Sequence, residues 1–414
     1  MRPVAGRWMT ILRPGRFVRF RRQQTIDTVT MIADHDPGRQ WLSLHGNDRP
    51  DRAEMRLSRQ YAQAISRQGR KTKKGAATMS GQTTAGMLSI QETIPPEEAE
   101  AIRVITQSAE AKLRIAAQSP PARRDAHAKA HGCVRAEFRV LDSLPSALRA
   151  GVFAVPRTYQ AWIRLSNGAD KPGADKSLDG RGMAIKLMGV EDSPSTTQDF
   201  LMINHPAFFV RNAADYVDFQ TASAIWHFFI PGFNPFNFRL HEGLVAYRIA
   251  SQTVTNPLNI RYWSMTPYRF GTIACKFSAR PSGAASLFVG TDGADFLHDN
   301  LARHLATEQA TFDFMVQLRT KPDTQPIEDP TVTWEESDAP FVPVASITIP
   351  RQTFDSPEQK AFCENLSFTP WHCVEAHQPL GGINRVRRTV YETISRVRHE
   401  LNAAPRREPT GFAE

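Results

Sequence analysis

The sequence has no run of eighteen or more apolar residues, so it predicts no transmembrane helix and no stable membrane insertion. It has only four cysteines, Cys133, Cys275, Cys363 and Cys373, and no C-x-x-C pair. This spacing excludes a secreted disulfide framework. It also disfavours a zinc site, because His372 and Cys373 are adjacent without a second ligand pair nearby. We therefore expect reduced thiols in a cytoplasmic protein.

The sequence also has no excess of basic residues after residue 78, although all 414 residues together carry a formal charge of +9. Residues 1–78 hold 17 Lys and Arg against 6 Asp and Glu, a balance of +11, which leaves −2 for the other 336 residues. A nucleic-acid-binding body would carry its own basic patch, so we expect no nucleic-acid partner. We interpret residues 1–88 as a basic, disordered tail, or as the product of a gene start placed upstream of Met79.

No internal repeat is present, and the remaining chain reads as one α+β domain over residues 89–402 followed by a flexible C-terminal tail, 403–414. Pro-Pro and acidic residues open a predicted helix at 95–117. Alternating apolar residues predict strands in the middle of the chain, at 158–166, 182–189, 311–320 and 344–350. Residues 226–238 are aromatic, with Gly and Pro too frequent for regular structure.

A second predicted helix, near the C-terminus, carries a tyrosine among arginines. Its apolar stripe consists of Val386, Val390, Ile394, Val397 and Leu401. Tyr391 points about 100° away from the stripe, and Arg387 and Arg398 project to nearly the same side. Within the helix two interpretations stay open: a solvated basic face, or a phenol whose ionised form is stabilised by a guanidinium.

Three further stretches contain polar and aromatic residues in a distinctive order. They read "RRDAHAKAHGCVRAEF" at 123–138, "WIRLSNGADKPGADKSLDGRGMAIKL" at 162–187 and "DFLMINHPAFFVRNAADYVDF" at 199–219. Together with "RRTVY" at 387–391, their combination and order resemble the haem catalase superfamily. The resemblance covers about residues 95–400, roughly three quarters of the chain. It implies an antiparallel β-barrel with surrounding helices, without the flavodoxin-like C-terminal domain of large catalases.

The resemblance also implies the roles of the residues on the distal side of a haem. His127 would be the distal acid/base, with Ser166 nearby. Asn204 would assist at the peroxide, and Phe209 would lie over the haem. The motifs depart from the family at Ala126, Ile203 and His205, where valine, asparagine and threonine are usual.

On the other side the resemblance implies that Tyr391 is the axial ligand of a b-type haem iron, with Arg387 one helical turn before it stabilising the tyrosinate. Arg124 and Arg164 would neutralise the haem propionates. His372 and Cys373 are the alternative axial ligands.

Two other histidines are interpreted as structural. His131 is read as a neighbour of the site, the alternative being a second ligand. His205 is read as a buried histidine with its hydrogen bonds satisfied, the alternative being an acid/base group beside Asn204.

The function implied is a haem-dependent oxidoreductase of catalase or peroxidase type, acting on hydrogen peroxide. One alternative is an enzyme that rearranges or cleaves a fatty-acid hydroperoxide, as catalase-like allene oxide synthases do, for which Ala126 leaves more room. A second alternative is a haem-binding protein without turnover. The expected partner is a small peroxide or organic hydroperoxide, and the resemblance implies a homo-oligomer.

Overall fold

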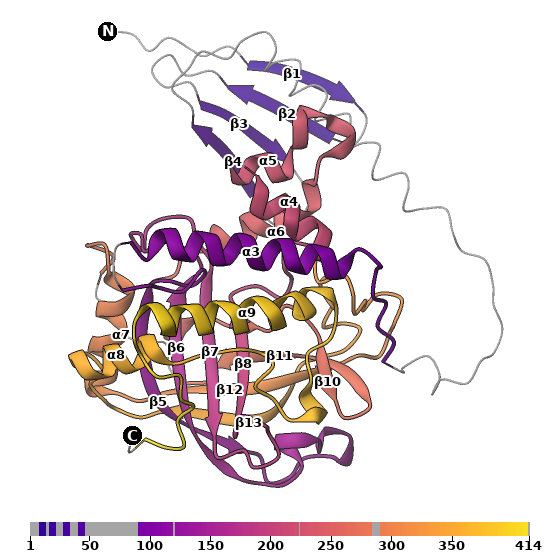
Figure 1. Cartoon of the computed structure of the whole chain (residues 1–414). Coiled ribbons are helices and arrows are strands. Elements are labelled where there is room, and N and C mark those ends of the chain that lie inside the picture. The colour runs from indigo at the N-terminus through magenta and orange to yellow at the C-terminus, as the bar shows by residue number, and fades with distance from the viewer. Residues whose placement is uncertain are drawn as a thin grey trace, which may run out of the picture. The chain divides into compact units, whose positions relative to one another are not determined.

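The structure, a computed structural model, describes residues 90–412 apart from 119–120, 223 and 284–289, together with four strands nearer the N-terminus (Figure 1). These are β1 (Trp8–Arg13), β2 (Arg16–Arg21), β3 (Thr28–Ala33) and β4 (Gln40–His45), which form two antiparallel pairs, β1 with β2 and β3 with β4. They are regular structure in a segment where the sequence predicts disorder. The rest of residues 1–89 lies outside the described residues, so the prediction of a disordered tail stays a prediction there.

The chain divides into two compact units. The first comprises Met1–Met79 and Phe233–Asn237, and the second Ser80–Gly232 and Phe238–Glu414. All the predicted site residues belong to the second unit, which is described below.

The second unit is built on a nine-stranded antiparallel sheet with the order β10-β11-β12-β13-β5-β6-β7-β8-β9. Because β9 also pairs with β11, eight of these strands close into a barrel, and β10 extends it as a hairpin with β11. The expected antiparallel β-barrel with surrounding helices is confirmed. The strands are β5 (Ala130–Val140), β6 (Thr158–Asn167), β7 (Arg181–Met188), β8 (Thr197–Ile203), β9 (Tyr262–Trp263), β10 (Tyr268–Phe270), β11 (Ile273–Pro281), β12 (Ala310–Leu318) and β13 (Val342–Ile349).

Phenylalanine side chains fill the inside of this barrel. The period of two predicted for 311–320 is confirmed, because Phe312, Phe314 and Val316 are fully buried in the core. The ring of Phe314 lies 5.0 Å from that of Phe138 and 4.7 Å from that of Phe200, measured between centroids. A small barrel packed in this way has no room for a ligand inside, so a functional site has to lie on its outer surface.

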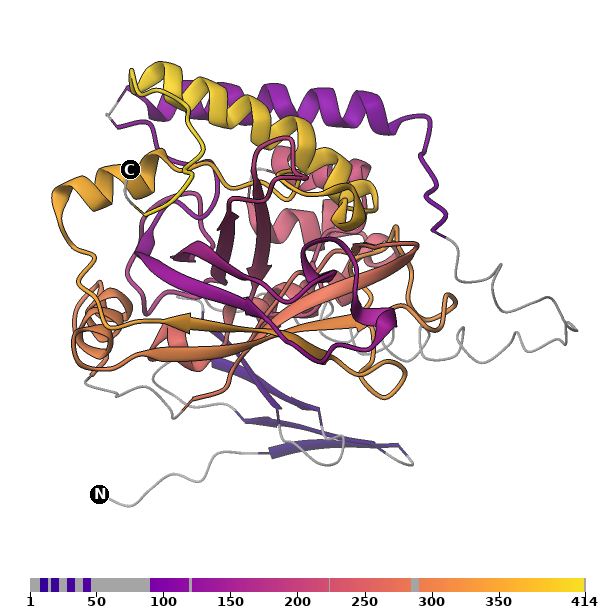
Figure 2. The same cartoon turned by 90° about the horizontal axis from the view of Figure 1, so that it is seen from below.

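Two long helices cover the outer face of the barrel at β5–β8. Helix α3 (Glu98–Ala116) and helix α9 (Gly382–Leu401) lie side by side over these strands in both views (Figures 1 and 2). Both predicted helices are thereby confirmed. Of the predicted α9 stripe, four residues are buried against α3, but Leu401 is 41% exposed because the helix ends there.

The other helices of the described residues are shorter: α4 (Ala213–Thr221), α5 (Ile225–Phe229), α6 (Leu240–Ala250), α7 (Phe296–Thr307) and α8 (Pro357–Asn365). The prediction that 226–238 lacks regular structure is wrong at its start, since α5 begins at Ile225 and ends at Phe229. No helix among the described residues combines the length and the apolar character needed to cross a membrane.

The C-terminal segment, residues 403–412, makes contacts with the barrel, and its flexibility stays a prediction. The Glu408 carboxylate lies 2.6 Å from the ammonium of Lys186, a fully buried residue of β7. The ring of Phe412 packs edge-on against Trp162 of β6, 5.5 Å between centroids. Local sequence patterns do not predict these contacts, because each joins residues more than 200 positions apart.

Candidate functional site

A row of three residues with small or aliphatic side chains crosses the outer face of the barrel below the helices. Ser166 of β6 pairs with Gly182 of β7, and Gly182 pairs with Ile203 of β8. The strand neighbours of these residues point into the barrel core, so the row itself faces outward. We call Ser166, Gly182 and Ile203 the distal row.

His127 lies directly on this row. Its Nδ1 is 3.0 Å from the Ser166 hydroxyl oxygen, and its backbone N–H donates to the carbonyl of Gly168 at 3.1 Å. A Cβ placed on Gly182 would come within 2.6 Å of the imidazole ring, so only glycine leaves room for the ring there. His127 also adopts φ 57°, a left-handed conformation that costs a non-glycine residue free energy and is typical of functional sites.

The electrostatic environment keeps the His127 imidazole neutral. Burial and the nearby guanidiniums of Arg164, Arg387 and Arg124 lower its pKa to about 4. A neutral imidazole accepts a proton at physiological pH, which is the state that a general base needs. The contact between His127 and Ser166 agrees with the position that the family resemblance implies for Ser166.

Three arginines gather next to His127, and we call Arg124, Arg164 and Arg398 the three-arginine cluster. Arg164 of β6 donates to the His127 carbonyl at 2.8 Å. Arg124 donates to the carbonyl of Leu366 at 2.5 Å, and Arg398 of α9 donates to the same carbonyl at 3.4 Å. Arg398 was not assigned a role from the sequence, although its position on the Tyr391 side of the helix was noted.

This cluster carries more positive charge than its surroundings balance. Glu364 is the one carboxylate that ion-pairs with it among the described residues, at 3.1 Å from Arg124 and 3.3 Å from Arg398. Burial, together with the Arg124 guanidinium, lowers the pKa of Arg164 to about 10 and that of Arg398 to about 9. The buried Nε of Arg164 has no hydrogen-bond partner. Since guanidinium groups stay protonated at neutral pH, the cluster favours a bound ligand with two negative charges.

Tyr391 and Arg387 form the opposite side of the site on α9. Arg387 donates from Nε to the Tyr391 hydroxyl at 3.3 Å, and its guanidinium carbon lies 5.2 Å from the ring centre. Burial acts against the Arg387 charge, but the phenols of Tyr391 and Tyr268 outweigh burial and raise the Arg387 pKa. Arg387 also donates to the Asn384 side-chain oxygen at 3.2 Å, which fixes its orientation. The guanidinium is therefore held where it stabilises a tyrosinate.

The alternative iron ligands have less suitable surroundings. Burial raises the pKa of the Cys373 thiol to about 12, which disfavours a thiolate. His372 lies 3.3 Å from Asp199 and 3.7 Å from Glu408, so it belongs to the buried charge cluster of Lys186. Tyr216 packs against the same helices as Tyr391, but burial and then the charge of Tyr391 raise its pKa to about 12. Of these residues, Tyr391 is the one whose hydroxyl accepts a hydrogen bond from the buried Arg387 guanidinium.

The side-chain amide of Asn204 bonds to the protein backbone. Its side-chain oxygen accepts from the Arg181 backbone N–H at 2.8 Å, and its side-chain nitrogen donates to the Ile249 carbonyl at 2.8 Å. Both halves of the amide therefore hold β7 and α6 together. Ile203, the preceding residue, lies beside Gly182 on the distal row. The peroxide-binding role of Asn204 stays a prediction.

Phe209 lies in a cluster of aromatic rings on the segment after β8. Its ring is 4.8 Å from that of Phe208 and 5.1 Å from that of Phe219, between centroids. Tyr216 packs against the same cluster and also against the α3–α9 interface beside Tyr391. The predicted position of Phe209 over a haem stays a prediction.

The two histidines interpreted as structural have protein partners. Nε2 of His131 is 2.8 Å from the Asn167 side-chain oxygen, and burial lowers the His131 pKa to about 4. Nδ1 of His205 lies 3.0 Å from the Ala207 carbonyl. Both contacts agree with the structural interpretation.

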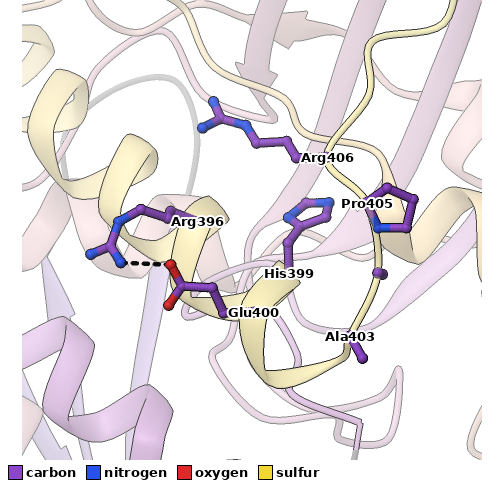
Figure 3. A pocket seen from close by; sticks show the side chains of 7 residues that line it. Arg396, His399, Glu400, Ala403, Pro405 and Arg406 are labelled. Atoms are coloured by element: carbon purple, nitrogen blue, oxygen red, sulfur yellow. Dashed lines mark hydrogen bonds and ion pairs between the residues drawn. The ribbon is translucent and has the colours of Figure 1, made fainter.

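A surface groove of about 510 Å³ at the end of α9 lies apart from this constellation (Figure 3). His399, one of its lining residues, contacts the carbonyls of Ser395 and Asn365 with its two ring nitrogens, at 2.7 and 2.9 Å. Arg396 and Glu400 form an ion pair on the groove's rim. Its polar groups all have protein partners, Arg406 pairing with Glu392, and we assign no chemistry to the groove.

Comparison with known proteins points to one family. The catalase family model matches residues 111–224, which include His127, Arg164, the distal row and Phe209. No match is found among curated protein sequences.

Three similar solved structures are catalases. A fungal catalase is 17% identical, with a TM-score of 0.56, and the match covers 69% of this chain and 61% of that one. Catalase A from Saccharomyces cerevisiae is 16% identical, with a TM-score of 0.56 and coverage of 79% and 70%. A bacterial catalase is 17% identical, with a TM-score of 0.53 and coverage of 83% and 72%. This chain thus spans 61% to 72% of their lengths, and at these identities the likeness shows the fold. The fold of this chain is therefore catalase-like, and residues 111–224 match the catalase family model.

Proposed function

We propose that this chain is a haem-dependent enzyme acting on peroxides, with Tyr391 as the axial iron ligand and His127 as the acid/base group. One observation carries the proposal: the buried Arg387 guanidinium hydrogen-bonds the Tyr391 phenol, and after burial and Arg164 it is also one of the charges that lower the pKa of His127. One buried charge therefore acts on a residue suited to hold ferric iron and on a residue suited to accept a proton.

The surroundings fit a b-type haem in two further respects. The three-arginine cluster lacks about two negative charges, which matches the two propionates of haem, and Arg398 joins Arg124 and Arg164 in this role. Arg387, Tyr391 and Arg398 stand on one side of α9 by their helical spacing, and Arg387 and Arg398 are buried there. The family likewise favours haem.

Haem bound there would supply a ferric iron that accepts an oxygen atom from a peroxide and is then reduced by a second donor. The chain's own residues handle the proton. Nδ1 of His127 contacts Ser166, and its neutral ring takes a proton from the incoming peroxide and returns it to the departing oxygen. Gly182 keeps the space for that ring, and Arg164 holds the His127 backbone carbonyl.

The test is peroxide consumption by the haem-loaded protein and by its His127→Gln variant. We expect the variant to keep the haem spectrum and to lose turnover by about 10²-fold or more, because only the proton-transfer group is removed. Retention of wild-type turnover by His127→Gln would contradict the assignment. If the haem-loaded wild type consumes peroxide no faster than free haem does, the alternative of a haem-binding protein without turnover is supported.

A second candidate substrate, an organic hydroperoxide, is favoured by Ile203. This aliphatic side chain stands on the distal row beside Gly182, and it packs in an apolar cluster with Ala207, Val245 and Met265. Apolar surface there suits an alkyl chain better than the second oxygen of hydrogen peroxide. Oxygen evolution from hydrogen peroxide, compared with the loss of lipid-hydroperoxide diene absorbance, separates the two substrates.

An Ile203→Asn variant sharpens this comparison. It adds an amide on the distal row without altering Asn204, which keeps its backbone contacts. We expect hydrogen peroxide turnover to rise relative to lipid hydroperoxide turnover, and Ile203→Val to leave the ratio unchanged. A ratio that does not move in Ile203→Asn would argue against substrate selection by this residue.

A further inference from the structure

Two of the four cysteines lie together between the barrel and α8. Cys133 of β5 and Cys363 of α8 are 3% and 5% exposed and belong to one buried cluster, and their thiols hydrogen-bond to each other. Their neighbours in the cluster are Trp162, Met188 and Leu366.

An independent contact fixes the two elements at this point. Gln359, one helical turn before Cys363 on α8, donates from its side chain to the Cys133 carbonyl at 2.9 Å. Because residues four apart share a face of a helix, the same face of α8 presents both Gln359 and Cys363 to β5. The proximity of the two cysteines therefore follows from backbone placement as well as from the thiol contact.

The pair also borders the three-arginine cluster. Cys133 is the direct cross-strand partner of Arg164, and Arg124 donates to the Cys363 carbonyl at 3.1 Å. The hydrogen bond from Cys133 lowers the pKa of Cys363 to about 7 against the effect of burial, with further lowering by Arg164 and Arg124. Burial raises the pKa of Cys133 well above its usual value. Of the two thiols, Cys363 therefore forms a thiolate more readily than Cys133.

The remaining two cysteines provide a built-in contrast. Burial raises the pKa of Cys275 well above its usual value and that of Cys373 to about 12. The Cys275 thiol contacts a carbonyl, that of Arg269, at 3.8 Å. All four cysteines are buried, so burial does not explain why the pKa of Cys363 is lowered.

We propose that Cys133 and Cys363 form a dithiol site that a hydroperoxide oxidises to a disulfide. The Cys363 thiolate attacks one peroxide oxygen, the O–O bond breaks, and an alcohol or water leaves, so that Cys363 becomes a sulfenic acid. The Cys133 sulfur then attacks the Cys363 sulfur, the S–O bond breaks, and water leaves with the Cys133 proton. The two thiols supply the two electrons that reduce the peroxide.

The inference rests on the proposed function for the supply of the peroxide alone. The disulfide would join β5 to the end of α8, whose Cys363 and Leu366 carbonyls bind Arg124. Oxidation of the pair would therefore act on the part of the site that is proposed to hold the propionates.

The experiment treats the full-length chain with hydrogen peroxide, with and without added haem, and counts free thiols by alkylation and mass spectrometry after denaturation. We expect the four free thiols to fall to two, with a peptide cross-link between Cys133 and Cys363. In Cys363→Ser the other three thiols should survive, and in Cys133→Ser dimedone should trap a sulfenic acid at Cys363. A Cys275→Ser/Cys373→Ser double variant is the matched control and should form the cross-link like the wild type.

Four surviving thiols in the peroxide-treated wild type, or losses that fall equally on Cys275 and Cys373, would overturn the proposal. Its failure is distinguishable from failure of the proposed function. Thiol loss is read by mass with or without haem, whereas haem ligation is read from the absorption spectrum.

Discussion

The two faces of the barrel wall follow opposite rules, and strand β6 shows both. Its inward residues Ile163 and Leu165 are fully buried among phenylalanines, whereas its outward residues Arg164 and Ser166 are equally buried but polar. Inside the barrel, the core consists of apolar side chains that pack against one another, and none of them is charged. Outside, beneath α3 and α9, positive charge exceeds negative charge, and His127 occupies a space that a single added carbon would close. The inner face stabilises the fold, and the outer face holds the chemistry.

The largest expected effect is a loss of stability when a buried side chain inside the barrel is removed. Phe314→Ala should lower the free energy of unfolding by about 3–5 kcal/mol, because it removes a fully buried ring and leaves a cavity. Urea unfolding measures the change. Arg164→Gln, one residue on the outer face, is the comparison and should change stability far less, since it removes a charge that burial already disfavours. Equal losses in the two variants would contradict the contrast between the faces.

Gly182→Ala tests the outer face without changing its charge. The added Cβ would meet the His127 ring at 2.6 Å, so the imidazole must move. We expect turnover to fall by about 10²-fold, as misplacement of a catalytic group by about 1 Å does, with the haem spectrum retained. Gly173→Ala is the matched control, because a Cβ there meets nothing within 4 Å. Full activity in Gly182→Ala would remove His127 from the mechanism.

Arg398→Ala tests whether the excess positive charge serves a dianionic ligand. Loss of one buried, charge-assisted hydrogen bond should weaken haem binding by about 10- to 100-fold. Arg396→Ala, two residues earlier, removes an exposed arginine paired with Glu400 and should leave haem affinity unchanged. Haem titration followed by absorbance gives both values. If the two variants bind haem equally well, the three-arginine cluster is not the propionate site.

The smallest expected effect is that of pH on turnover. Burial and neighbouring arginines lower the His127 pKa from 6.5 to about 4, so the neutral base persists as the pH falls through the range where an ordinary histidine becomes protonated. We expect the turnover of the haem-loaded protein to stay nearly constant from neutral pH down to about 5 and to decline only as the pH approaches 4. A decline centred near 6.5 would show that His127 is not held neutral.

What the sequence predicts well is what depends on local pattern. The two long helices, the alternation in β12 and the pairing of Arg387 with Tyr391 one turn apart all follow from spacing along the chain. The barrel is predicted only by the resemblance to the catalase superfamily, because the spacing of residues within one strand does not show how the strands are arranged.

What the sequence does not predict depends on residues far apart in the chain. Gly182 is needed because the ring of His127, 55 positions earlier in the chain, lies against it. The sequence motifs do not show that these two residues are in contact. Asn204 carries the expected residue type, but its amide bonds to the backbone of Arg181 and Ile249, contacts that the motif does not reveal. The contact of Cys133 with Cys363 likewise arises only when α8 packs on β5.

The central claim is that Tyr391, supported by Arg387, holds a haem iron between α9 and the outer face of the barrel. The most direct test is the absorption spectrum of the haem-supplemented protein beside that of its Tyr391→Phe variant. The account predicts a high-spin ferric tyrosinate spectrum in the wild type that collapses in the variant. A haem spectrum unchanged by Tyr391→Phe, or the lack of any haem signal in the wild type, would contradict it.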